Sequence, residues 1–334
     1  MAVADEHEAG RAACAKKLGV ERTYADYREM LAKEQPQIVA VAPRWLDCHR
    51  DMAIACAAAG AHIFMEKPLS RTLAEADEMI AACDRAKVKC AIAHQTRYSP
   101  KLARVKELIA HGQLGEILEL RGRGKEDPRG GGEDLMVLGT HIFDLMRFIA
   151  GDARWCSARV FDGGKSTTKA TVRSGNEGIG PLAGDTLDAM YGFDHNVSGY
   201  FASHRPTDRG GSRFGLTVYG TKGVLDIATG GLGTVHFLAD PNWSAARSKK
   251  PWVEVSTVGL GQPEPLKDRG LHGGNVAIAQ DLLRCIEANT QPLGSIRDGR
   301  AALEMILAVY ESHRLGAPVS IPLVNRQHPL ALIQ

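Results

Sequence analysis

One apolar strand pattern in this chain ends in residues that could contact a ligand. His62-Ile63-Phe64-Met65 is followed directly by Glu66, Lys67 and Pro68. Parallel sheets bind their ligands at the carboxyl ends of their strands, so this carboxylate and this amine stand where a ligand site is expected. The plain structural alternative for Lys67 is a solvated lysine at a strand end.

The elements around this segment predict a parallel sheet. Short apolar runs alternate with helical patterns; the runs cover 2–4, 38–42, 62–65 and 90–93, and the helical patterns cover 52–58 and 73–83. Such runs are typical of strands buried on both faces, and right-handed crossovers place the helices on both sides. A further helix from Ser99-Pro100 to Gly112 closes this part. We predict an α/β fold in which residues 1–115 form a Rossmann-type dinucleotide-binding domain.

The strict alternation of strand and helix patterns ends before about Glu116. Strand patterns of mixed polarity follow at 117–121, 186–193, 198–203, 214–219 and 224–227. They predict a large, mostly antiparallel sheet with one solvated or ligand-facing side. Helical patterns at 134–149 and 298–313 interrupt it, and 241–265 is predicted to be an irregular insertion. Residues 116–325 are therefore predicted to form an α+β substrate and oligomerisation domain, with helix 298–313 packing back on the first domain.

The start of the chain lacks one part of a dinucleotide site. A glycine-rich turn must join the first strand to the first helix, because only glycine lets backbone N–H groups approach the pyrophosphate closely. Ala2-Val3-Ala4 has the pattern of the second strand, and Asp5 the place of the carboxylate that binds the ribose of NAD; a helix N-cap is an equal alternative for Asp5. We expect the first strand and its turn to lie upstream of Met1, and weak NAD binding without them.

The segment around Glu66-Lys67-Pro68 resembles a known signature, that of the glucose-fructose oxidoreductase, inositol dehydrogenase and rhizopine-catabolism (Gfo/Idh/MocA) family. The resemblance extends over nearly the whole chain, with matching segments at His49, Gln95 to Pro100, Gly131 to Asp144, Tyr219 to Gly223 and Glu311 to Leu323. It implies an NAD(P)-dependent oxidoreductase that transfers hydride between nicotinamide and a secondary alcohol or ketone of a sugar, inositol or related polyol.

The same resemblance implies roles for particular residues. Lys67 would lie beside the nicotinamide and hydrogen-bond the substrate oxygen whose charge changes. His141 would be the general acid/base, a task that suits imidazole, whose unperturbed pKa is about 6.5. The implied cofactor-binding residues are Asp5, Pro43, His49, Glu66, Lys67 and Gln95, and the implied substrate-binding residues are Gln95, Arg97 and Asp134. Asp5 favours NAD over NADP because a carboxylate there repels a 2′-phosphate.

One position departs from the family pattern. The family commonly pairs its histidine with an aspartate four residues earlier, and that position here is Val137. Asp134 lies seven residues before His141, about 10 Å away by helix rise, so it can reach substrate but hardly the same imidazole. Asp144, one turn after His141, could hold the ring. The working hypothesis is that His141 acts without the usual aspartate, while Asp134 or Glu133 binds substrate hydroxyls.

Composition excludes several classes of function. The 334 residues are 44% hydrophobic and 24% charged with a formal net charge of +2, and the basic residues are scattered, so nucleic acid is not expected as a partner. No cluster of ligands predicts a metal, and no apolar run approaches the ~20 residues of a membrane helix. Seven cysteines without paired spacing predict reduced thiols in the cytoplasm, although an export signal could precede Met1.

Several functions remain open from the sequence. The expected substrate is a small polyhydroxylated molecule, and relatives suggest a homodimer or homotetramer through the C-terminal sheet. The alternatives are a non-catalytic cofactor or sugar sensor, a glycosidase that uses NAD transiently, a dihydrodiol dehydrogenase-type enzyme, and a fragment without function. Ser212 has part of a nucleophile-elbow pattern but lacks the final glycine.

Overall fold

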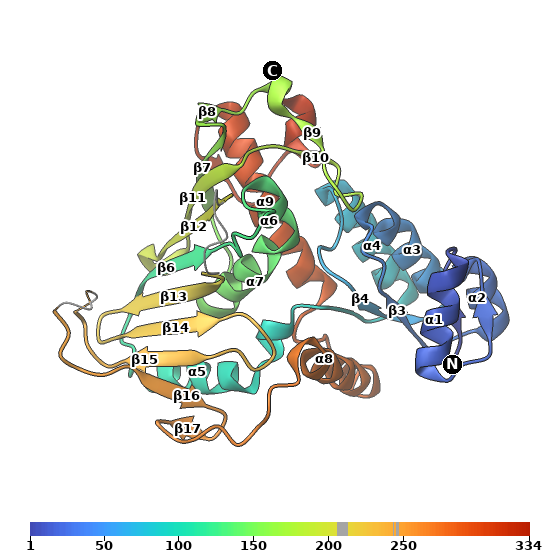
Figure 1. Cartoon of the computed structure of the whole chain (residues 1–334), viewed down its shortest axis with the longest axis horizontal. Coiled ribbons are helices and arrows are strands. Elements are labelled where there is room, and N and C mark those ends of the chain that lie inside the picture. Colours follow the sequence, from blue (N-terminus) through green and yellow to red (C-terminus); the bar gives the residue numbers. More distant parts are fainter. Residues whose placement is uncertain (206–212, 243, 245–246) are drawn as a thin grey trace.

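The computed structural model places two unequal halves side by side (Figure 1). It describes residues 1–205, 213–242, 244 and 247–334, so Ser212 lies outside the described residues. The first part of the chain, residues 1–110, consists of short parallel strands and helices; its blue to cyan elements form one half of the picture, and its last helix, residues 100–110, lies beneath the broad sheet. The other half is built on one broad sheet, and helix α9 (Ile296–Leu315) stands between the two.

The first half has the predicted alternation of strands and helices. Its elements are β1 (Val3–Ala4), α1 (Glu8–Leu18), β2 (Thr23–Tyr24), α2 (Tyr27–Glu34), β3 (Ile38–Val41), α3 (His49–Ala58), β4 (His62–Met65), α4 (Leu73–Ala86), β5 (Cys90–Ile92) and α5 (Pro100–Ala110). All of its strand pairs are parallel. The predicted Rossmann-type parallel sheet is confirmed.

This parallel sheet is divided into two pieces. β1 pairs only with β2, and β3, β4 and β5 form a separate three-stranded sheet. In the usual order of a doubly wound sheet, the first strand lies between the second and the fourth, which correspond to β1 and β3 here. The division therefore falls at the place of the strand that carries the glycine-rich turn.

Local signals fix the helices of this half. Thr72 caps α4 by accepting a hydrogen bond from Glu75 N, as expected of an N-cap threonine. Leu73, Met79 and Cys83 bury the apolar face of this helix. At α5, Ser99 occupies the N-cap position, but its hydroxyl is buried without a hydrogen-bond partner among the described residues. The start of α5 therefore depends on Pro100, whose ring fixes φ for the first helical position.

The second half contains an eleven-stranded mixed sheet. Its strands are β6 (Ile117–Arg123), β7 (Trp155–Asp162), β8 (Lys165–Ser166), β11 (Thr186–Gly192), β12 (Ser198–His204), β13 (Gly215–Gly220), β14 (Val224–Ala228), β15 (Val235–Leu238), β16 (Val253–Ser256), β17 (Gly259–Leu260) and β18 (Val319–Ser320). Among the described strands of this sheet, only β6 and β12 pair in parallel. The predicted mostly antiparallel sheet is confirmed, whereas the irregular insertion predicted at 241–265 is wrong in part, because it contains β16 and β17.

The helix predicted at 134–149 is two helices, so that prediction is wrong. α6 (Gly132–Val137) and α7 (Gly139–Ala150) meet at Leu138, where φ is −120° and ψ −35°. The apolar stripe continues across this break, which hides it from a periodicity argument. The His141 N–H donates to the Leu138 carbonyl instead of the carbonyl four residues back.

Helix α9 joins the two halves. A capping box of Ser295 and Asp298 starts it, and Gly316 ends it in the left-handed conformation. It packs on β7 and α7 in the sheet half and on α4 and β5 in the parallel half. A hairpin of β9 (Arg173–Ser174) and β10 (Pro181–Leu182), together with α8 (Gly270–Glu287), completes the described elements that bear on the site. No described helix is both long and apolar enough to cross a membrane.

Candidate active site

Lys67 leaves the carboxyl end of β4 and reaches into the second half. Its Nζ donates to the Val137 carbonyl at 3.2 Å, while its backbone N–H donates to Glu66 Oε2 at 3.1 Å. Burial lowers the pKa of Lys67, against the opposing influence of the Glu66 and Glu177 carboxylates. The amine is therefore held by one backbone acceptor and is easier to deprotonate than an exposed lysine.

The helix break supplies that acceptor. In a continuous helix, the Val137 carbonyl would accept the His141 N–H, four residues on. Because that N–H turns to Leu138, the Val137 carbonyl is available to Lys67. The position where the family pattern has an aspartate thus contributes its backbone to the site.

His141 occupies the first turn of α7, close enough to Lys67 for the two charges to interact. Burial, the charge of Lys67 and the charge of His94 lower the pKa of His141 well below its ordinary value, and Asp144 opposes them only weakly. The imidazole is therefore neutral at neutral pH. Two aromatic rings meet it edge-on, with centroids 5.6 Å away for His94 and 6.2 Å away for Phe214.

Asp144 does not hold His141, contrary to one possibility raised by the sequence. Its carboxylate accepts a fork of hydrogen bonds from Arg97, at 2.6 to 3.0 Å, and lies 3.2 Å from His94 Nδ1. Burial alone would raise the pKa of Asp144, but the charges of His94 and Arg97 lower it below its ordinary range. Asp144 is thus an ionised group inside the protein, and its charge is compensated by these partners.

The structure does not support substrate binding by Arg97. The residue is only 7% exposed, and its guanidinium donates to the Asp144 carboxylate, the Asp144 carbonyl and the Leu293 carbonyl. Asp298, at the start of α9, lies 3.6 Å away. The guanidinium is thus occupied by protein groups, and Arg97 links the end of β5 to α7 and to the start of α9.

The predicted contact of Asp134 with substrate hydroxyls is likewise unsupported. The carboxylate is completely buried and accepts from Ser203 Oγ, Lys125 N and Glu126 N. Burial raises the pKa of Asp134 despite these bonds. Gly124 makes the arrangement possible, because a Cβ there would approach the carboxylate to 2.0 Å. Asp134 therefore fixes the loop before α6.

His49 links the ends of two strands instead of facing the cofactor. Its buried ring lies between the Pro43 carbonyl, 2.9 Å from Nε2, and the Pro68 carbonyl, 3.0 Å from Nδ1. Both ring nitrogens are engaged by backbone, so direct cofactor binding by His49 is not supported. Pro43 and Pro68 follow β3 and β4, and the ring holds these two strand ends at a fixed separation.

Gln95 points to another neighbour than the one predicted. It is 5% exposed, and its amide donates to Asn275 Oδ1 of α8 at 3.0 Å. Gly274 allows this close packing, because a Cβ there would lie 2.7 Å from Gln95. The contact with cofactor and substrate predicted for Gln95 is therefore not supported by its position.

Asp5 is exposed at the carboxyl end of β1. Its Oδ1 accepts from His7 N at 2.9 Å, and His7, not Asp5, caps α1. The N-cap alternative for Asp5 is therefore wrong. Its other carboxylate oxygen receives no hydrogen bond from the described residues, so Asp5 is free to contact a ribose.

These positions fit the two ends of a nicotinamide dinucleotide unequally. Lys67 and His141 lie close enough for their charges to interact, whereas Asp5 is exposed at the end of β1 in the separate two-stranded piece. The turn after β1, Asp5-Glu6-His7, contains no glycine. This turn therefore lacks the glycine-rich sequence that cradles a pyrophosphate in a dinucleotide site.

A loop from the second half reaches the same place. Glu177, in the turn between β9 and β10, pairs with Arg44 after β3, and the Glu177 carbonyl accepts from Leu46 N at 2.8 Å. Asn176 lies beside Glu133, with 3.5 Å between Nδ2 and Oε2. We name residues 175–180 the strap. Apart from its glycines, no local pattern predicts the strap, because its partners Arg44 and Glu133 lie 133 and 43 positions away in the chain.

His94 is the main site residue that sequence reasoning missed. It directly follows the predicted strand 90–93, where the rule that directed attention to Lys67 also applies. Gln95 and Arg97 drew the attention instead, through the family motif.

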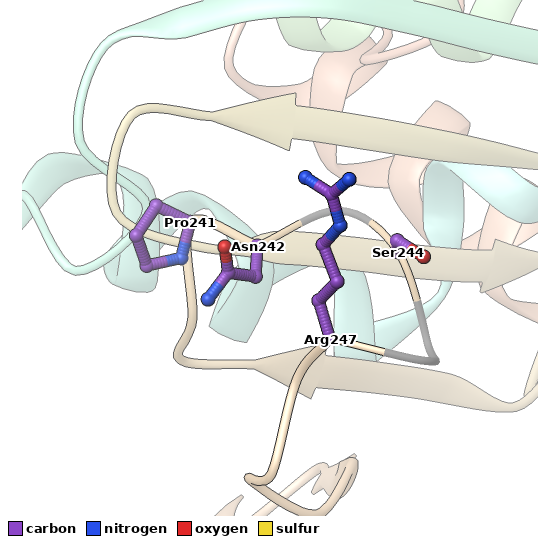
Figure 2. A pocket seen from close by; sticks show the side chains of 4 residues that line it. All are labelled: Pro241, Asn242, Ser244 and Arg247. Carbon is purple, nitrogen blue, oxygen red and sulfur yellow. The ribbon is translucent and has the colours of Figure 1, made fainter.

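No predicted site residue lines a surface hollow that lies beyond β15. This hollow, about 400 Å³ in volume, is formed by Pro241, Asn242, Ser244 and Arg247 beyond β15 (Figure 2). Within the described parts of the chain, no three His, Cys, Asp or Glu side chains are grouped as a metal site would require.

Two family models match the chain. Residues 1–94 match the oxidoreductase family with an NAD-binding Rossmann fold, and residues 106–321 match the C-terminal α/β domain of the same family. A levoglucosan dehydrogenase complex with NADH and levoglucosan has the same fold, with a TM-score of 0.76 at 22% identity over 96% of this chain and 90% of that one.

Characterised relatives cover the chain to different extents. Levoglucosan dehydrogenase of Pseudarthrobacter phenanthrenivorans is 28% identical over 64% of this chain and 61% of its own length. Myo-inositol 2-dehydrogenase of Thermotoga maritima is 28% identical over 59% and 63%. D-apiose dehydrogenase of Paraburkholderia graminis is 25% identical over 98% and 84%. The match thus spans less than two thirds of the first two relatives.

Fold, site and family models together define an oxidoreductase-type protein with an NAD-binding Rossmann unit and a C-terminal α/β unit. The chain belongs to the Gfo/Idh/MocA family.

Proposed function

We propose that the protein is an NAD-dependent dehydrogenase that oxidises a secondary alcohol of a sugar, inositol or related polyol, or catalyses the reverse reduction. The observation that carries the proposal is the convergence of a partly buried lysine, Lys67, and a neutral imidazole, His141, at the carboxyl end of β4. The named activities of the relatives, on levoglucosan, myo-inositol and D-apiose, support this substrate class.

Each of the two residues has one task. Lys67 donates a hydrogen bond to the substrate oxygen, which stabilises the negative charge that develops as the O–H bond breaks. His141 accepts the hydroxyl proton, for which its lowered pKa keeps it ready at neutral pH. Bound NAD would supply the acceptor for the hydride that leaves the substrate carbon. The alcohol thus loses a proton and a hydride and becomes a ketone.

NAD is favoured over NADP by the exposed Asp5. Its unpaired carboxylate oxygen suits the 2′-hydroxyl of NAD, and its negative charge repels a 2′-phosphate. We infer that Pro43 and Glu66 flank the nicotinamide side of the site, because both follow the ends of parallel strands, β3 and β4.

A panel of polyols and sugars tests the proposal. The full chain is incubated with NAD and each alcohol while NADH formation is followed, with His141→Asn and Lys67→Met as matched variants. We expect turnover of at least one polyol by the unmodified chain and strong loss in both variants. Firm NADH binding with no turnover across the panel would instead favour the sensor, the alternative raised by Val137.

Two further proposals concern the environment of the protein. One face of the sheet is free of α7 and presents Tyr200, Arg121, Thr217 and Asp226 in one cross-strand row. A homo-oligomer through this face is the expected assembly, and light scattering of the purified chain tests it. The seven cysteines are all free thiols, which agrees with the cytoplasmic location that we propose.

A further inference from the structure

His94 lies between the two halves at the candidate active site. It lies two residues beyond the end of β5 in the parallel half and is only 1% exposed. Its ring stands edge-on to the His141 ring, with centroids 5.6 Å apart and planes at 69°. A second imidazole thus contacts the one that we propose as the acid/base.

The nitrogens of His94 are anchored on the helix that carries His141. Nε2 is 2.9 Å from the Thr140 hydroxyl, and Nδ1 is 3.2 Å from Asp144 Oδ1 without the alignment of a hydrogen bond. Thr140 immediately precedes His141, and Asp144 lies one turn beyond it. His94 is therefore attached to α7 on both sides of His141.

His141 itself has no other such support. Among the described residues, no hydrogen bond to either of its ring nitrogens is found, and position 137 carries a valine, whose backbone is used by Lys67. The remaining contact of this kind is Phe214, at 6.2 Å and 80°. A ring without hydrogen bonds is oriented by what packs against it, since rotation about χ2 of histidine is otherwise soft.

We propose that His94 is the positioning residue of His141, and that its ring takes the place of the aspartate found one turn earlier in the family pattern. This inference rests on the proposed function for its catalytic meaning. His94 holds the imidazole by an edge contact, and Thr140 and Asp144 hold His94. The charged groups that act on His141 are Lys67, His94 and Asp144, and those around His94 are Asp144 and Arg97.

The central experiment compares His94→Leu, which removes the ring, with His94→Phe, which keeps a ring and removes the nitrogens. Imidazole resonances of ¹⁵N-labelled, cofactor-free protein are recorded, with His141 assigned from His141→Gln. We expect His94→Leu to move the His141 resonances and His94→Phe to preserve them more closely. His328→Phe is the matched control, because His328 is also buried but lies away from the site.

Kinetics supply the second measurement. Loss of orientation lowers kcat by about 10- to 100-fold in His94→Leu, with little change in KM, and His94→Phe restores most of it. In the pH profile of kcat, the fall on the acid side moves to higher pH in both variants. The reason is that the charge of His94, which both variants remove, opposes protonation of His141. A structural role alone would not move the acid side of this profile.

Three results would overturn the proposal. The first is that His94→Leu matches the unmodified chain in both kcat and the His141 resonances, and the second is that His94→Phe is as impaired as His94→Leu. The third is that the acid side of the pH profile of kcat is unchanged in both variants. If His94→Leu does not fold, Thr140→Val replaces it, with a smaller loss in the same direction expected. Failure of the polyol panel would refute the proposed function alone, since the resonances are measured without cofactor or substrate.

Discussion

The two ends of the proposed cofactor site are built in different ways. At the nicotinamide end, His94, Arg97 and Asp144 are almost completely buried and are held by α7 and α9. At the adenosine end, Asp5 is exposed, and β1 and β2 are strands of two residues each, separate from the main parallel sheet. In the proposed site, the catalytic residues would thus be held by contacts between the halves, whereas binding of the nucleotide would rely on the small and separate piece formed by β1 and β2.

The largest expected effect is that of His141→Asn. Loss of general acid/base catalysis costs about 10²- to 10⁴-fold in kcat, while NADH affinity stays within the error of a fluorescence titration. This split confirms that the nicotinamide end performs chemistry without supplying most of the binding. An equal loss of NADH affinity would contradict it.

Asp144→Asn is expected to have the next largest effect, on stability. Removing one partner of a buried ion pair costs about 3–5 kcal/mol in free energy of unfolding, measured by urea denaturation. Asp194→Asn, at the exposed pair with Arg154, serves as the control. A change no larger than that of the control would show that the nicotinamide end is not the firmer one.

The pH dependence of stability follows from the same carboxylate. The pKa of Asp144 is lower in the folded protein than in the unfolded chain, so its contribution is fully present above the unfolded pKa, about 4. It declines as the pH falls from there through the folded pKa. The difference in free energy of unfolding between the unmodified chain and Asp144→Asn should therefore become smaller in acid. A difference that stays constant down to pH 3 would argue against an ionised Asp144.

Asp5→Asn tests the adenosine end. Losing a charged hydrogen-bond acceptor to ribose costs about 1.5 kcal/mol, roughly tenfold in NADH affinity, with no change in kcat at saturating cofactor. Discrimination against NADPH should fall in parallel. Unchanged affinities for both cofactors would remove Asp5 from the cofactor site.

The smallest effect is expected at the strap. Arg44→Gln breaks an ion pair whose arginine is largely exposed, so stability changes by about 0–1 kcal/mol. The negative charge of Glu177 raises the pKa of Lys67 and so favours its charged form. Glu177→Gln removes this charge and should instead raise KM for the polyol, which Lys67 binds in the proposed mechanism. If Arg44→Gln and Glu177→Gln act alike in every assay, the strap is only a surface contact.

Local pattern predicted the parts of the fold that depend on short stretches of chain. The strand before Glu66 and Lys67 is apolar and ends sharply, and α9 carries both a capping box and a terminal glycine, so these elements were visible in the sequence. β7 mixes Trp155 and Cys156 with Arg159 and Asp162, and this mixture conceals its buried face. The break at Leu138 interrupts the backbone but not the apolar stripe.

Site residues were predictable only where a strand end points to them. Lys67 follows from that rule, and His94 would have followed had it been applied to the next strand. The family resemblance implied that Arg97 and Asp134 bind substrate, yet their partners Asp144 and Ser203 lie 47 and 69 positions away in the chain. Whether a charged side chain faces a ligand or another part of the protein is decided by such distant pairings.

The anchor of Lys67 has a consequence for how this site tolerates mutation. Its acceptor is a main-chain carbonyl, which every amino acid possesses, so exchange of the Val137 side chain does not delete the contact. The contact therefore depends on the backbone kink at Leu138 and not on the identity of residue 137. Any side chain that fits the buried surroundings of position 137 leaves it intact.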